Sequence, residues 1–587
     1  MTRVAPAILL TESVSVAGRA ALGEYVTYRP SARPTLRQML TELRPAIAIC
    51  RKGLDASTAQ AWRAAVSSGR LMLVSEPLDS DEETILVTHE IEAATTAPYA
   101  DRDQFAIAAL RMAERTWLRP PERSTPATRV RPPSRVALVG AGIVNLITAL
   151  QLVRAGHEVV IFEAAPDPRD TRAPALYGCT SGGGNARMFT LTEADNYSDK
   201  RFGPSQTLPV LLGKPASAGG WMLNEGHPSA AEARWTNECS HLPAWLSENY
   251  TEDILAFNRE SGELWDALRR DEPKIFDGVA LRDGVLRLYD DSRYFQAQIE
   301  RQRKVGALLR VLQPDELVER HAALAQARKG LLVGGMEVRG FTLAIHGFVA
   351  NLLASLEDSG AGIRFENRID CLHWSSGEVA GLVTNAGVVT ADHYVISPGV
   401  YGADVLRGTS SDEQIHGVLG VWLMVPNVEP RLAYSLKVSR RGHATEDSNI
   451  TVADDERGQP VLILGAGYGW VGRSLSKVNP RQLEVLFAAT EDTASKLFPR
   501  ASAAARADGM LTASRRVCVR PWTTTSLGVF EMLPAYGDGV AIVTGGHNTG
   551  GFAQAPAVAR AVCSALAGRC HPMHTLYRPD RRRSFLR

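Results

Sequence analysis

Residues 135–164 read Arg-Val-Ala-Leu-Val-Gly-Ala-Gly-Ile-Val-Asn-Leu-Ile-Thr-Ala-Leu-Gln-Leu-Val-Arg-Ala-Gly-His-Glu-Val-Val-Ile-Phe-Glu-Ala, and this stretch decides the fold. The apolar run 136–139 predicts a buried parallel strand, and 143–155 has the spacing of an amphipathic helix. A second strand follows at 159–162 and ends at Glu163. Strand, glycine turn, helix and strand in this order predict a dinucleotide-binding βαβ unit.

The turn that leaves the first strand has the composition of a phosphate-binding loop. Gly140 and Gly142 let the backbone approach a pyrophosphate closely. The helix that starts at Ile143 and Val144 directs its N–H groups and the positive end of its dipole toward the same point. Glu163 stands where dinucleotide-binding folds place the acid that accepts hydrogen bonds from ribose hydroxyls.

The third glycine of the usual fingerprint is replaced by Asn145. Helix and strand pack closely at this position, so either the packing is looser here or the amide makes a contact of its own. A parallel-sheet crossover that binds no nucleotide is the alternative interpretation. The complete order of strand, glycines, helix, strand and acid favours nucleotide binding.

Length and composition limit the classes of protein to which the chain can belong. The 587 residues are 45% hydrophobic, which is enough for several cores and for three domains or lobes. The net charge of +1 gives no basic field that would hold nucleic acid. No apolar run has the length of a membrane-spanning helix, and the first residues lack the pattern of a signal peptide. We therefore expect a soluble cytoplasmic protein.

The cysteines indicate neither a disulfide framework nor a structural metal. They are seven in number, scattered and without CxxC pairs. The nearest approach to a metal cluster is Cys563, Cys570, His571 and His574, which we interpret as a helix end and tail rather than as ligands. No metal site is predicted.

Residues 1–118 are expected to form a small α/β domain. Strand and helix segments alternate through it, at 7–10, 35–43, 46–50, 71–74 and 104–117, with a helix capped by Asp55 or Ser57 and ending at Val66 between the strands 46–50 and 71–74. This alternation predicts a parallel sheet. The spacing weakly resembles the N-terminal lobe of D-2-hydroxyacid dehydrogenases. Because the segment has no glycine fingerprint, we carry no activity over and expect a docking, dimerising or vestigial domain, with a homo-oligomer as one outcome.

Two segments outside the domains are rich in arginine. The linker, 119–134, lies in a stretch, 118–135, that holds five prolines and five arginines against one acid, which favours extended backbone. A solvated tether is the preferred interpretation, and an anionic partner is the alternative. Residues 571–587 form a basic tail, of which we expect 578–587 to be disordered.

Three later stretches suit a flat ligand. The loop 177–188 contains three consecutive glycines, which let a loop pass tightly against a ligand; a flexible surface loop is the alternative. A strand that starts at Tyr394 ends in Gly399, where backbone can approach the same ligand. A strand at 540–543 runs into Thr-Gly-Gly-His-Asn-Thr-Gly-Gly-Phe, 544–552, and a helix N-terminus, which makes a second polar cradle.

Strands expected at 417–425 and 448–453 predict a separate sheet, a candidate substrate lobe. Residues 462–472 contain Gly-Ala-Gly-Tyr-Gly and look like a second fingerprint. The helix expected at 480–496 is followed by no strand with a terminal acid, however, so a second nucleotide site is not expected. We interpret this stretch as a strand end that presents Tyr468 to the active site.

In their order, these motifs resemble the D-amino-acid oxidase superfamily of FAD-dependent oxidoreductases, and most closely its D-amino-acid dehydrogenase branch. The resemblance covers about residues 134–569 and rests on the fingerprint with Glu163, Ser397-Pro-Gly399, the Arg-Pro at Arg520 and the glycines of 544–552. It implies an α/β protein with an FAD-binding Rossmann-like domain and an α+β substrate domain, joined to the small N-terminal α/β domain.

Within residues 135–570, the resemblance places the parts of the two lobes. The FAD-binding parts fall at about 135–200, 345–402 and 510–570, and the substrate lobe at about 205–345 and 403–510. The implied FAD contacts come from the fingerprint, the glycine-rich loop and two later turns: Gly140, Gly142, Ile143, Val144, Asn145, Glu163, Ser181, Gly182, Asn185, Ala186, Gly399, Gly545, Gly546, Asn548, Thr549 and Gly550.

The implied reaction oxidises the C–N bond of an amino acid or related amine by hydride transfer to flavin N5. The imine hydrolyses to an oxo acid and ammonia, and the electrons pass to oxygen, a quinone or another protein. Arg520 would grip a carboxylate or stabilise reduced flavin, Tyr468 would donate a hydroxyl, and His547 would contact flavin or carry a proton. Their structural alternatives are a surface ion pair, a packed aromatic and a capping residue.

The chain departs from the family's pattern at Asn145, in the loop 179–187 and after the Arg-Pro. Arg187, which replaces a small residue, is expected either to contact an anionic substrate or to block an ordinary one. The alternatives to an amine oxidoreductase are a flavin-dependent monooxygenase, for which we find no second intact fingerprint, and a non-catalytic scaffold that keeps FAD.

Overall fold

The chain divides into two compact units, which are described separately. The computed structural model describes residues 8–11, 26–28, 35–67, 70–95, 102–118, 133–170, 187–194, 208–327, 330–440, 444, 446–455 and 457–581. Unit 1 comprises Met1–Ser124, His241–Tyr250 and Arg578–Arg587, and unit 2 comprises Thr125–Ser240 and Thr251–Tyr577. Among the helices in the described ranges, none is long and apolar enough to cross a membrane.

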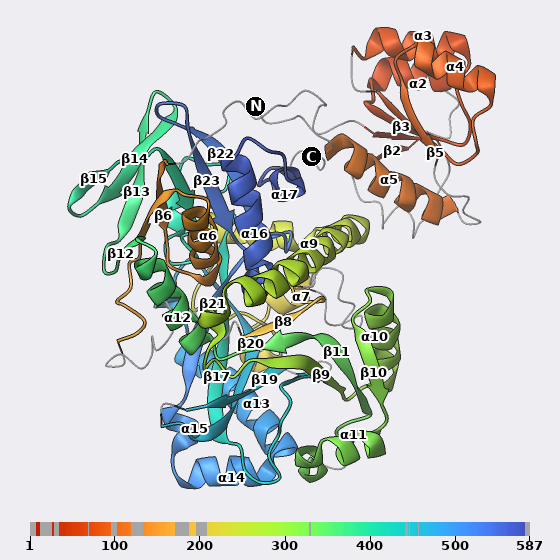
Figure 1. Ribbon diagram of the computed structural model, residues 1–587. Coiled ribbons are helices and arrows are strands. Elements are labelled where there is room, and N and C mark those ends of the chain that lie inside the picture. The colour runs from red at the N-terminus through yellow and green to blue at the C-terminus, as the bar shows by residue number, and fades with distance from the viewer. Residues whose placement is uncertain are drawn as a thin grey trace. The chain divides into compact units, whose positions relative to one another are not determined.

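Unit 1 contains a five-stranded parallel sheet in the order β2-β1-β3-β4-β5 (Figure 1). Its strands are β1 (Ile8–Leu10), β2 (Val26–Tyr28), β3 (Ile47–Cys50), β4 (Leu71–Val74) and β5 (Glu92–Thr95). Its helices are α2 (Leu36–Leu43), α3 (Ala56–Ala65), α4 (Ser80–Thr88) and α5 (Arg102–Leu118). This is a doubly wound order, and the expected parallel sheet is confirmed. The sequence did not predict β2, α4 or β5, because such short segments carry little periodicity.

A buried ion pair fixes the C-terminal segment within unit 1. Arg581 is 1% exposed, and its Nε and Nη2 donate to the two carboxylate oxygens of Glu114 at 2.7 and 3.1 Å. Asn249 Nδ2 donates to the same carboxylate at 3.0 Å, and the Arg581 guanidinium lies 4.6 Å from the Tyr250 ring centre. The expectation of disorder from 578 onward is therefore wrong for 578–581; residues 582–587 lie outside the described ranges.

Unit 2 is built on two nine-stranded sheets, and the first carries the glycine fingerprint. This fingerprint sheet has the order β12-β7-β6-β16-β23-β22-β14-β13, with β15 paired to β14. Its strands are β6 (Arg135–Val139), β7 (Glu158–Phe162), β12 (Gly362–Arg364), β13 (Ile369–Ser375), β14 (Glu378–Thr384), β15 (Gly387–Val389), β16 (His393–Ile396), β22 (Val529–Ala535) and β23 (Gly539–Gly545). The run β12-β7-β6-β16-β23 is parallel, as the sequence predicts for the nucleotide-binding part.

Three helices pack beside the parallel part of this sheet: α6 (Ile143–Arg154), α12 (Ile345–Asp358) and α16 (Gly551–Leu566). Both α12 and α16 contact α6. Because α6 is enclosed, its residues are apolar on nearly every side; Leu146, Ile147 and Leu150 are at most 2% exposed. The packing holds the N-termini of α6 and α16 in place beside the carboxyl ends of the strands.

The second sheet has the order β10-β11-β9-β18-β19-β20-β17-β21, with β8 paired to β11. Its strands are β8 (Met188–Thr190), β9 (Arg282–Tyr289), β10 (Leu308–Leu312), β11 (Gly334–Thr342), β17 (His416–Pro426), β18 (Leu436–Ser439), β19 (Asp447–Asp454), β20 (Pro460–Gly472) and β21 (Arg516–Trp522). All of its pairs are antiparallel except β9 with β18. The separate sheet expected for the substrate lobe is thus present.

Helices cover one face of the second sheet. α13 (Pro480–Leu497), α14 (Pro499–Ala507) and α15 (Met510–Ala513) pack on β17 and β20 (Figure 1). The remaining α-helices of the described chain are α7 (Leu208–Leu212), α8 (Ala230–Ser240), α9 (Ala244–Asp271), α10 (Ser292–Lys304), α11 (Pro314–Arg320) and α17 (Pro572–Leu576). The covered face is a hydrophobic core in which Leu436, Ile450 and Leu464 are fully buried.

Two strands lie in a different lobe from the one expected. β8 falls in the stretch 135–200 and β21 in 510–570, both expected in the FAD-binding part, yet both belong to the second sheet. Isolated segments do not reveal which sheet they join, because pairing partners lie far away in sequence. Residues 462–472 all belong to the long strand β20, not to a turn that leads into a helix. Because β20 continues to Gly472, Tyr468 lies inside the strand, and the expectation of a strand end there is wrong.

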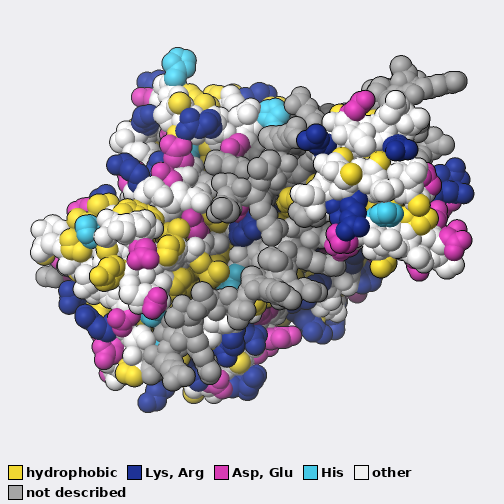
Figure 2. All heavy atoms as spheres, turned by 90° about the horizontal axis from the view of Figure 1, so that it is seen from above, with side chains coloured by type: hydrophobic (Ala, Val, Ile, Leu, Met, Phe, Trp, Pro, Cys, Tyr) yellow, Lys and Arg dark blue, Asp and Glu magenta, His cyan; other side chains and the backbone are white. Residues whose placement is uncertain are grey.

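The surface is mixed in charge. On the face that Figure 2 shows, the Lys and Arg side chains are interspersed with the Asp and Glu side chains. This agrees with the near balance of 65 basic and 64 acidic residues, and it gives the visible face no field of a single sign that would attract a polyanion.

Candidate functional site

A cavity of about 580 Å³ lies in unit 2, where the fingerprint sheet faces the second sheet. On one side it is lined by residues that follow β6, β7 and β16, and by the segment before α16; on the other it is lined by residues of β18 to β21. Such a volume suits a cofactor or a substrate of moderate size.

The fingerprint turn, residues 140–145, exposes backbone to this cavity. Gly140 has a φ of +93°, and a Cβ there would lie 2.5 Å from the Ser397 carbonyl oxygen, so only glycine fits. Gly142 is the N-cap of α6 without a side-chain capping bond, and a Cβ on it would meet nothing within 4 Å. Ile143 and Val144, the first helical residues, line the cavity and present their N–H side to it.

Glu163 closes the turn from the end of β7. Its carboxylate accepts from the N–H groups of Ala141 at 2.7 Å and Ala165 at 2.8 Å, and the side chain lines the cavity. A carboxylate has about four acceptor positions, so two of them are left for hydroxyl groups of a ligand.

Asn145 does not line the cavity. Its Nδ2 donates to the carbonyls of Val139 at 2.7 Å and Gly140 at 2.9 Å, and the residue is 1% exposed. Of the two readings of this position, the structure therefore shows an amide with a contact of its own. The contact ties the helix to the strand that it follows.

The later turns reach the same cavity. Gly399, with a φ of +63°, and Gly545 both line it. So do Asn548 and Thr549, just before α16, whose N-cap Gly550 makes no side-chain capping bond. Gly546 and Gly550 flank these lining residues. Two helix N-termini without side-chain caps, those of α6 and α16, thus face one cavity, which suits a ligand with anionic groups.

The glycine-rich loop stays a prediction. Ser181, Gly182, Asn185 and Ala186 lie outside the described residues. Arg187, which follows them, lines the cavity and is 2% exposed.

The Arg187 guanidinium lies beside an aromatic ring and an imidazole. It lies 5.1 Å from the Trp422 ring centre, and its Nη2 lies 3.3 Å from Nε2 of His346. A cation is thus held at the wall of the cavity. Whether this cation contacts a substrate or blocks one stays a prediction.

Arg520, on β21, also lines the cavity. Its Nη1 donates to the Gly467 carbonyl at 3.0 Å, and its guanidinium lies 5.0 Å from the Tyr468 ring centre. A Cβ on Gly420 would come within 2.2 Å of Nη2, so glycine at this position makes room for the guanidinium. Within the described ranges, Arg520 forms no ion pair, which excludes its structural alternative there and leaves the charge available for an anionic ligand.

Tyr468 shows the packing that was its structural alternative, and its role as a hydroxyl donor stays a prediction. It lines the cavity from β20, and its ring stacks on Trp221 at 5.0 Å between centres. It belongs to a buried aromatic cluster with Trp470 and Trp522. The cluster fixes the ring on which the Arg520 guanidinium lies.

His547 lines the cavity and is 3% exposed. Burial lowers its pKa to about 4, and the nearby Gln554 amide offsets this only in part. The imidazole is therefore neutral near pH 7, which favours a packing or hydrogen-bonding role over that of a cationic acid.

Several cavity residues were not predicted from the sequence: Glu193, Lys437, Asp447, Asn449 and Cys518. Lys437 alternates with buried apolar neighbours on β18, and this alternation is the signal that identifies a strand with one polar face. It does not identify what the polar face meets.

Comparisons with known proteins agree with this geometry. A family model described as DAO, FAD dependent oxidoreductase, matches residues 135–565. D-amino acid dehydrogenase 2 of Ralstonia nicotianae is 26% identical to this chain, with 74% of this chain and 97% of the relative covered. D-amino acid dehydrogenase of Methylobacterium sp. is 27% identical, with 75% and 96% covered.

Solved structures show the same fold. Glycine oxidase from Bacillus cereus has a TM-score of 0.50 and 14% identity, with 76% of this chain and 98% of that chain covered. L-proline dehydrogenase from P. horikoshii has a TM-score of 0.50 and 15% identity, with 78% and 100% covered.

Proposed function

Because this chain belongs to the DAO family of FAD-dependent oxidoreductases, we propose that it oxidises the C–N bond of an amino acid or related amine whose carboxylate is held by Arg520. The curated relatives are named D-amino acid dehydrogenases, which supports an amino acid or amine as substrate. The observation that carries the proposal is the Arg520 guanidinium, which lines the cavity and, within the described ranges, has no ion-pair partner.

The cavity fits FAD. Gly140 cannot carry a side chain, and the space in front of Gly142 is open, so a diphosphate can lie against the backbone of the fingerprint turn. The two remaining acceptor positions of Glu163 suit ribose hydroxyls. The N-terminus of α16, with Asn548 and Thr549, would provide donors to polar atoms of bound FAD. Bound FAD supplies the two-electron acceptor, so that an amine can leave as an imine, which water hydrolyses to an oxo acid and ammonia.

The protein itself holds and orients the substrate. Arg520 presents a planar fork of N–H donors, which matches a carboxylate in two parallel hydrogen bonds. The Gly467 carbonyl and the Tyr468 ring fix the guanidinium before substrate arrives, which lowers the entropy that binding costs.

The other two predicted residues have supporting roles in this proposal. Tyr468 positions Arg520 and contributes a wall of the cavity. The neutral His547 contacts the bound cofactor rather than donating a proton as imidazolium, because its pKa of about 4 keeps it uncharged. The amine must then lose its proton to solvent before the reaction.

The test compares Arg520→Met with wild type. We expect the variant to keep FAD and its melting temperature, because the guanidinium has no buried carboxylate partner within the described ranges. Removing a charged hydrogen-bond donor should lower kcat/KM for the amino-acid substrate about 100-fold, or about 3 kcal/mol.

Arg407→Met is the matched control, because that side chain is 78% exposed. It should leave kcat/KM unchanged. Substrates are to be found by anaerobic flavin bleaching with D-amino acids, glycine derivatives and secondary amines. Wild-type turnover in Arg520→Met would refute the role of the guanidinium.

A further inference from the structure

The second sheet carries an ordered set of polar side chains that the proposed reaction at Arg520 does not use. On three adjacent strands, β9, β18 and β19, alternate residues lie on one face of the sheet because successive side chains of a strand point to opposite sides. We call them the polar face: Arg287, Tyr289, Lys437, Ser439, Asp447 and Asn449.

The strand register arranges this face in two rows. Lys437 lies between Arg287 and Asn449 in one row, and Ser439 lies between Tyr289 and Asp447 in the next. Except for Ser448, the alternating positions that point the other way are apolar and fully buried: Leu286, Leu288, Leu436, Val438 and Ile450. The same short strands therefore build a hydrophobic core on one side and a polar wall on the other.

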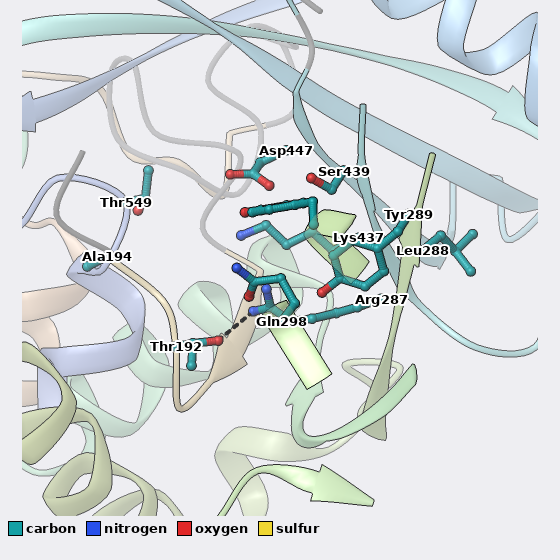
Figure 3. A pocket seen from close by; sticks show the side chains of 11 residues that line it. Thr192, Ala194, Arg287, Leu288, Tyr289, Gln298, Lys437, Ser439, Asp447 and Thr549 are labelled. Atoms are coloured by element: carbon teal, nitrogen blue, oxygen red, sulfur yellow. Dashed lines mark hydrogen bonds between the residues drawn. The ribbon is translucent and has the colours of Figure 1, made fainter. Parts of the chain in front are cut away.

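A small side pocket of about 20 Å³ lies over the polar face (Figure 3). Lys437, Asp447 and Thr549 line both this pocket and the main cavity, so the two spaces adjoin. Figure 3 shows the Lys437 ammonium and the Asp447 carboxylate at the same space. The pocket has room for about one water-sized group, which is the end of a ligand rather than a whole one.

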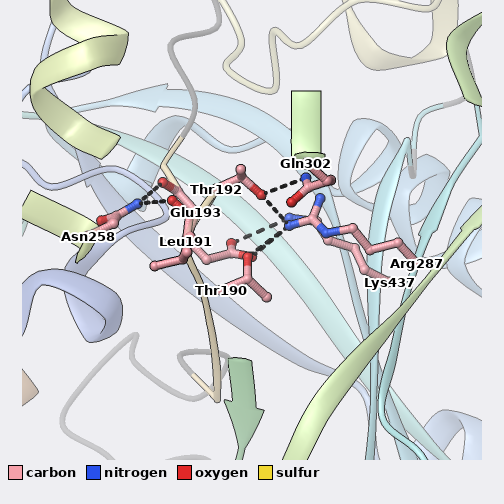
Figure 4. Close-up of polar contacts among 8 residues, drawn as sticks. All are labelled: Thr190, Leu191, Thr192, Glu193, Asn258, Arg287, Gln302 and Lys437. Carbon is pink, nitrogen blue, oxygen red and sulfur yellow. Dashed lines mark hydrogen bonds and ion pairs between the residues drawn. The ribbon is translucent and has the colours of Figure 1, made fainter. Parts of the chain in front are cut away.

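A turn that hydrogen bonds hold in place, residues 190–194, forms another wall of the pocket. Arg287 Nη2 donates to Oγ1 of Thr190 at 2.8 Å and of Thr192 at 2.9 Å, which ties the turn after β8 to the sheet (Figure 4). Asn258 Nδ2 donates to the carbonyls of Leu191 at 3.0 Å and Glu193 at 2.8 Å, which ties it to α9. The wall of the pocket is thus fixed before a ligand binds.

Lys437 keeps donors for a ligand. Its Nζ lies 3.4 Å from Glu193 Oε2, and an ammonium has three protons, so one ion pair does not use its capacity. Asp447 supplies acceptors on the neighbouring strand. One donor and one acceptor at the same opening match a dipolar group that both accepts and donates.

The distance from Arg520 requires an elongated ligand. Arg520 is on β21 and Lys437 on β18, four strand steps apart in the sheet, or roughly 19 Å between strand axes at about 4.8 Å a step. Between them, Gly465 and Gly467 line the cavity without side chains. Both charged sites thus open onto the same cavity.

We propose that Lys437 and Asp447 form a distal subsite for the amide end of an elongated substrate, with the amide oxygen on Lys437 and its N–H on Asp447. The inference rests on the proposed function because it assumes that Arg520 binds the carboxylate of the substrate. It names the substrate class: amino acids whose side chain ends in an amide, rather than short or purely aliphatic ones.

The test is calorimetric binding to the purified holoenzyme, which needs no turnover. The ligands are two series of aliphatic carboxylic acids of increasing length, one ending in a carboxamide and the other in an isosteric branched alkyl group. At the length that reaches the subsite, we expect the carboxamide to bind about tenfold more tightly, the worth of a hydrogen bond to a charged group. An N-methylamide arm separates a terminal carboxamide from a peptide-type amide.

Lys437→Met and Asp447→Leu should each abolish this preference while leaving the affinity of the alkyl series unchanged. Lys52→Met, at an exposed site in unit 1, is the control and should keep the preference. Melting temperatures identify any variant that fails to fold.

Equal affinity for both series at every length in wild type, or a preference that survives in both variants, overturns the subsite. If the preference is present but no amine bleaches the flavin, the subsite stands and the proposed function fails.

Discussion

The fingerprint turn and the polar face line the same cavity, but they are built in opposite ways. At the fingerprint turn the binding groups are backbone N–H groups, exposed because Gly140 and Gly142 have no side chains. At the polar face the binding groups are side chains, aligned because β9 shares a register with β18 and β19, which come from a distant part of the chain. The first site is local in sequence, and the second exists only in the folded sheet.

This difference explains what each site tolerates and what each contributes. A site built from backbone N–H groups is lost when a side chain is added in front of them. The ligand preference of a site built from side chains changes when those side chains are exchanged. We infer that the fingerprint turn holds the cofactor common to the family, while the polar face distinguishes this chain's substrate. The predictions below test this contrast, in order of decreasing effect.

The largest effect is expected from Gly140→Ala. The new Cβ would lie 2.5 Å from the Ser397 carbonyl oxygen, at a φ of +93°, so the turn must move and FAD should be lost. Gly142→Ala is the matched comparison, because its Cβ meets no protein atom within 4 Å. Gly142→Ala should fold as wild type does, and it should lower the affinity for FAD only because the new methyl group occupies space that FAD needs. Flavin content after gel filtration measures both, and a yellow Gly140→Ala protein would disprove the prediction.

At the polar face, Arg287→Met should destabilise the protein by about 4 kcal/mol. The change removes the two hydrogen bonds to Thr190 and Thr192 and a cation 3.5 Å from buried Glu193. Its measure is the urea midpoint of the unfolding transition. Arg303→Met, whose side chain is 57% exposed, is the control. Equal midpoints for Arg287→Met and wild type would contradict the bracing role.

Two buried histidines of unit 2 make stability depend on pH: His547, which lines the cavity, and His416, which does not. Burial lowers the pKa of His547 to about 4 and that of His416, on β17, to about 3. In the unfolded chain these groups take up a proton near pH 6.5, so the unfolded state binds more protons and stability falls as pH drops from 6.5 to 4. Between pH 6.5 and pH 4, each histidine lowers the free energy of unfolding by at most about 3 kcal/mol.

His416→Phe should flatten this acid dependence. The aromatic ring can keep the stacking on Trp235, which lies 4.8 Å away and nearly parallel. Thermal unfolding at pH 6.5 and pH 4 measures the change. A variant whose melting temperature falls with acid as steeply as that of wild type would show that His416 is not the titrating group.

The smallest effect is expected from Asn145→Gly, which restores the usual fingerprint. Loss of the hydrogen bonds to Val139 and Gly140 should cost about 2 kcal/mol of stability, although FAD affinity should change little because the side chain does not line the cavity. Urea unfolding and FAD titration measure the two quantities. A stabilised variant would mean that the amide contributes nothing.

The sequence predicted what is local. The strand, turn and helix of the fingerprint and the acid at Glu163 are where the pattern places them, because each depends on neighbours in the chain. Tyr468 is on a strand, as expected, but inside it rather than at its end. Glycines are informative here, since their positions in a turn follow from backbone geometry.

What is distant was not predicted. Lys437 and Asp447 are separated from Arg520 by many residues, and only the pairing order of the second sheet brings them to one cavity. For the same reason β8 and β21 were expected in the wrong lobe. The assignments for Ser181, Gly182, Asn185 and Ala186 stay predictions, because those residues lie outside the described ranges.

The central claim is that a flavin on the fingerprint turn accepts electrons from an amine held at Arg520. The most direct measurement is anaerobic mixing of the purified holoenzyme with the amino-acid and amine panel, followed at the visible flavin band. We predict bleaching by at least one amine, and a large loss of that bleaching in Arg520→Met. For each flavin reduced, a primary amine should release one ammonia, and an acyclic secondary amine should release one primary amine. A flavin that stays oxidised with every amine, or one that is reduced only by NADPH, would contradict it.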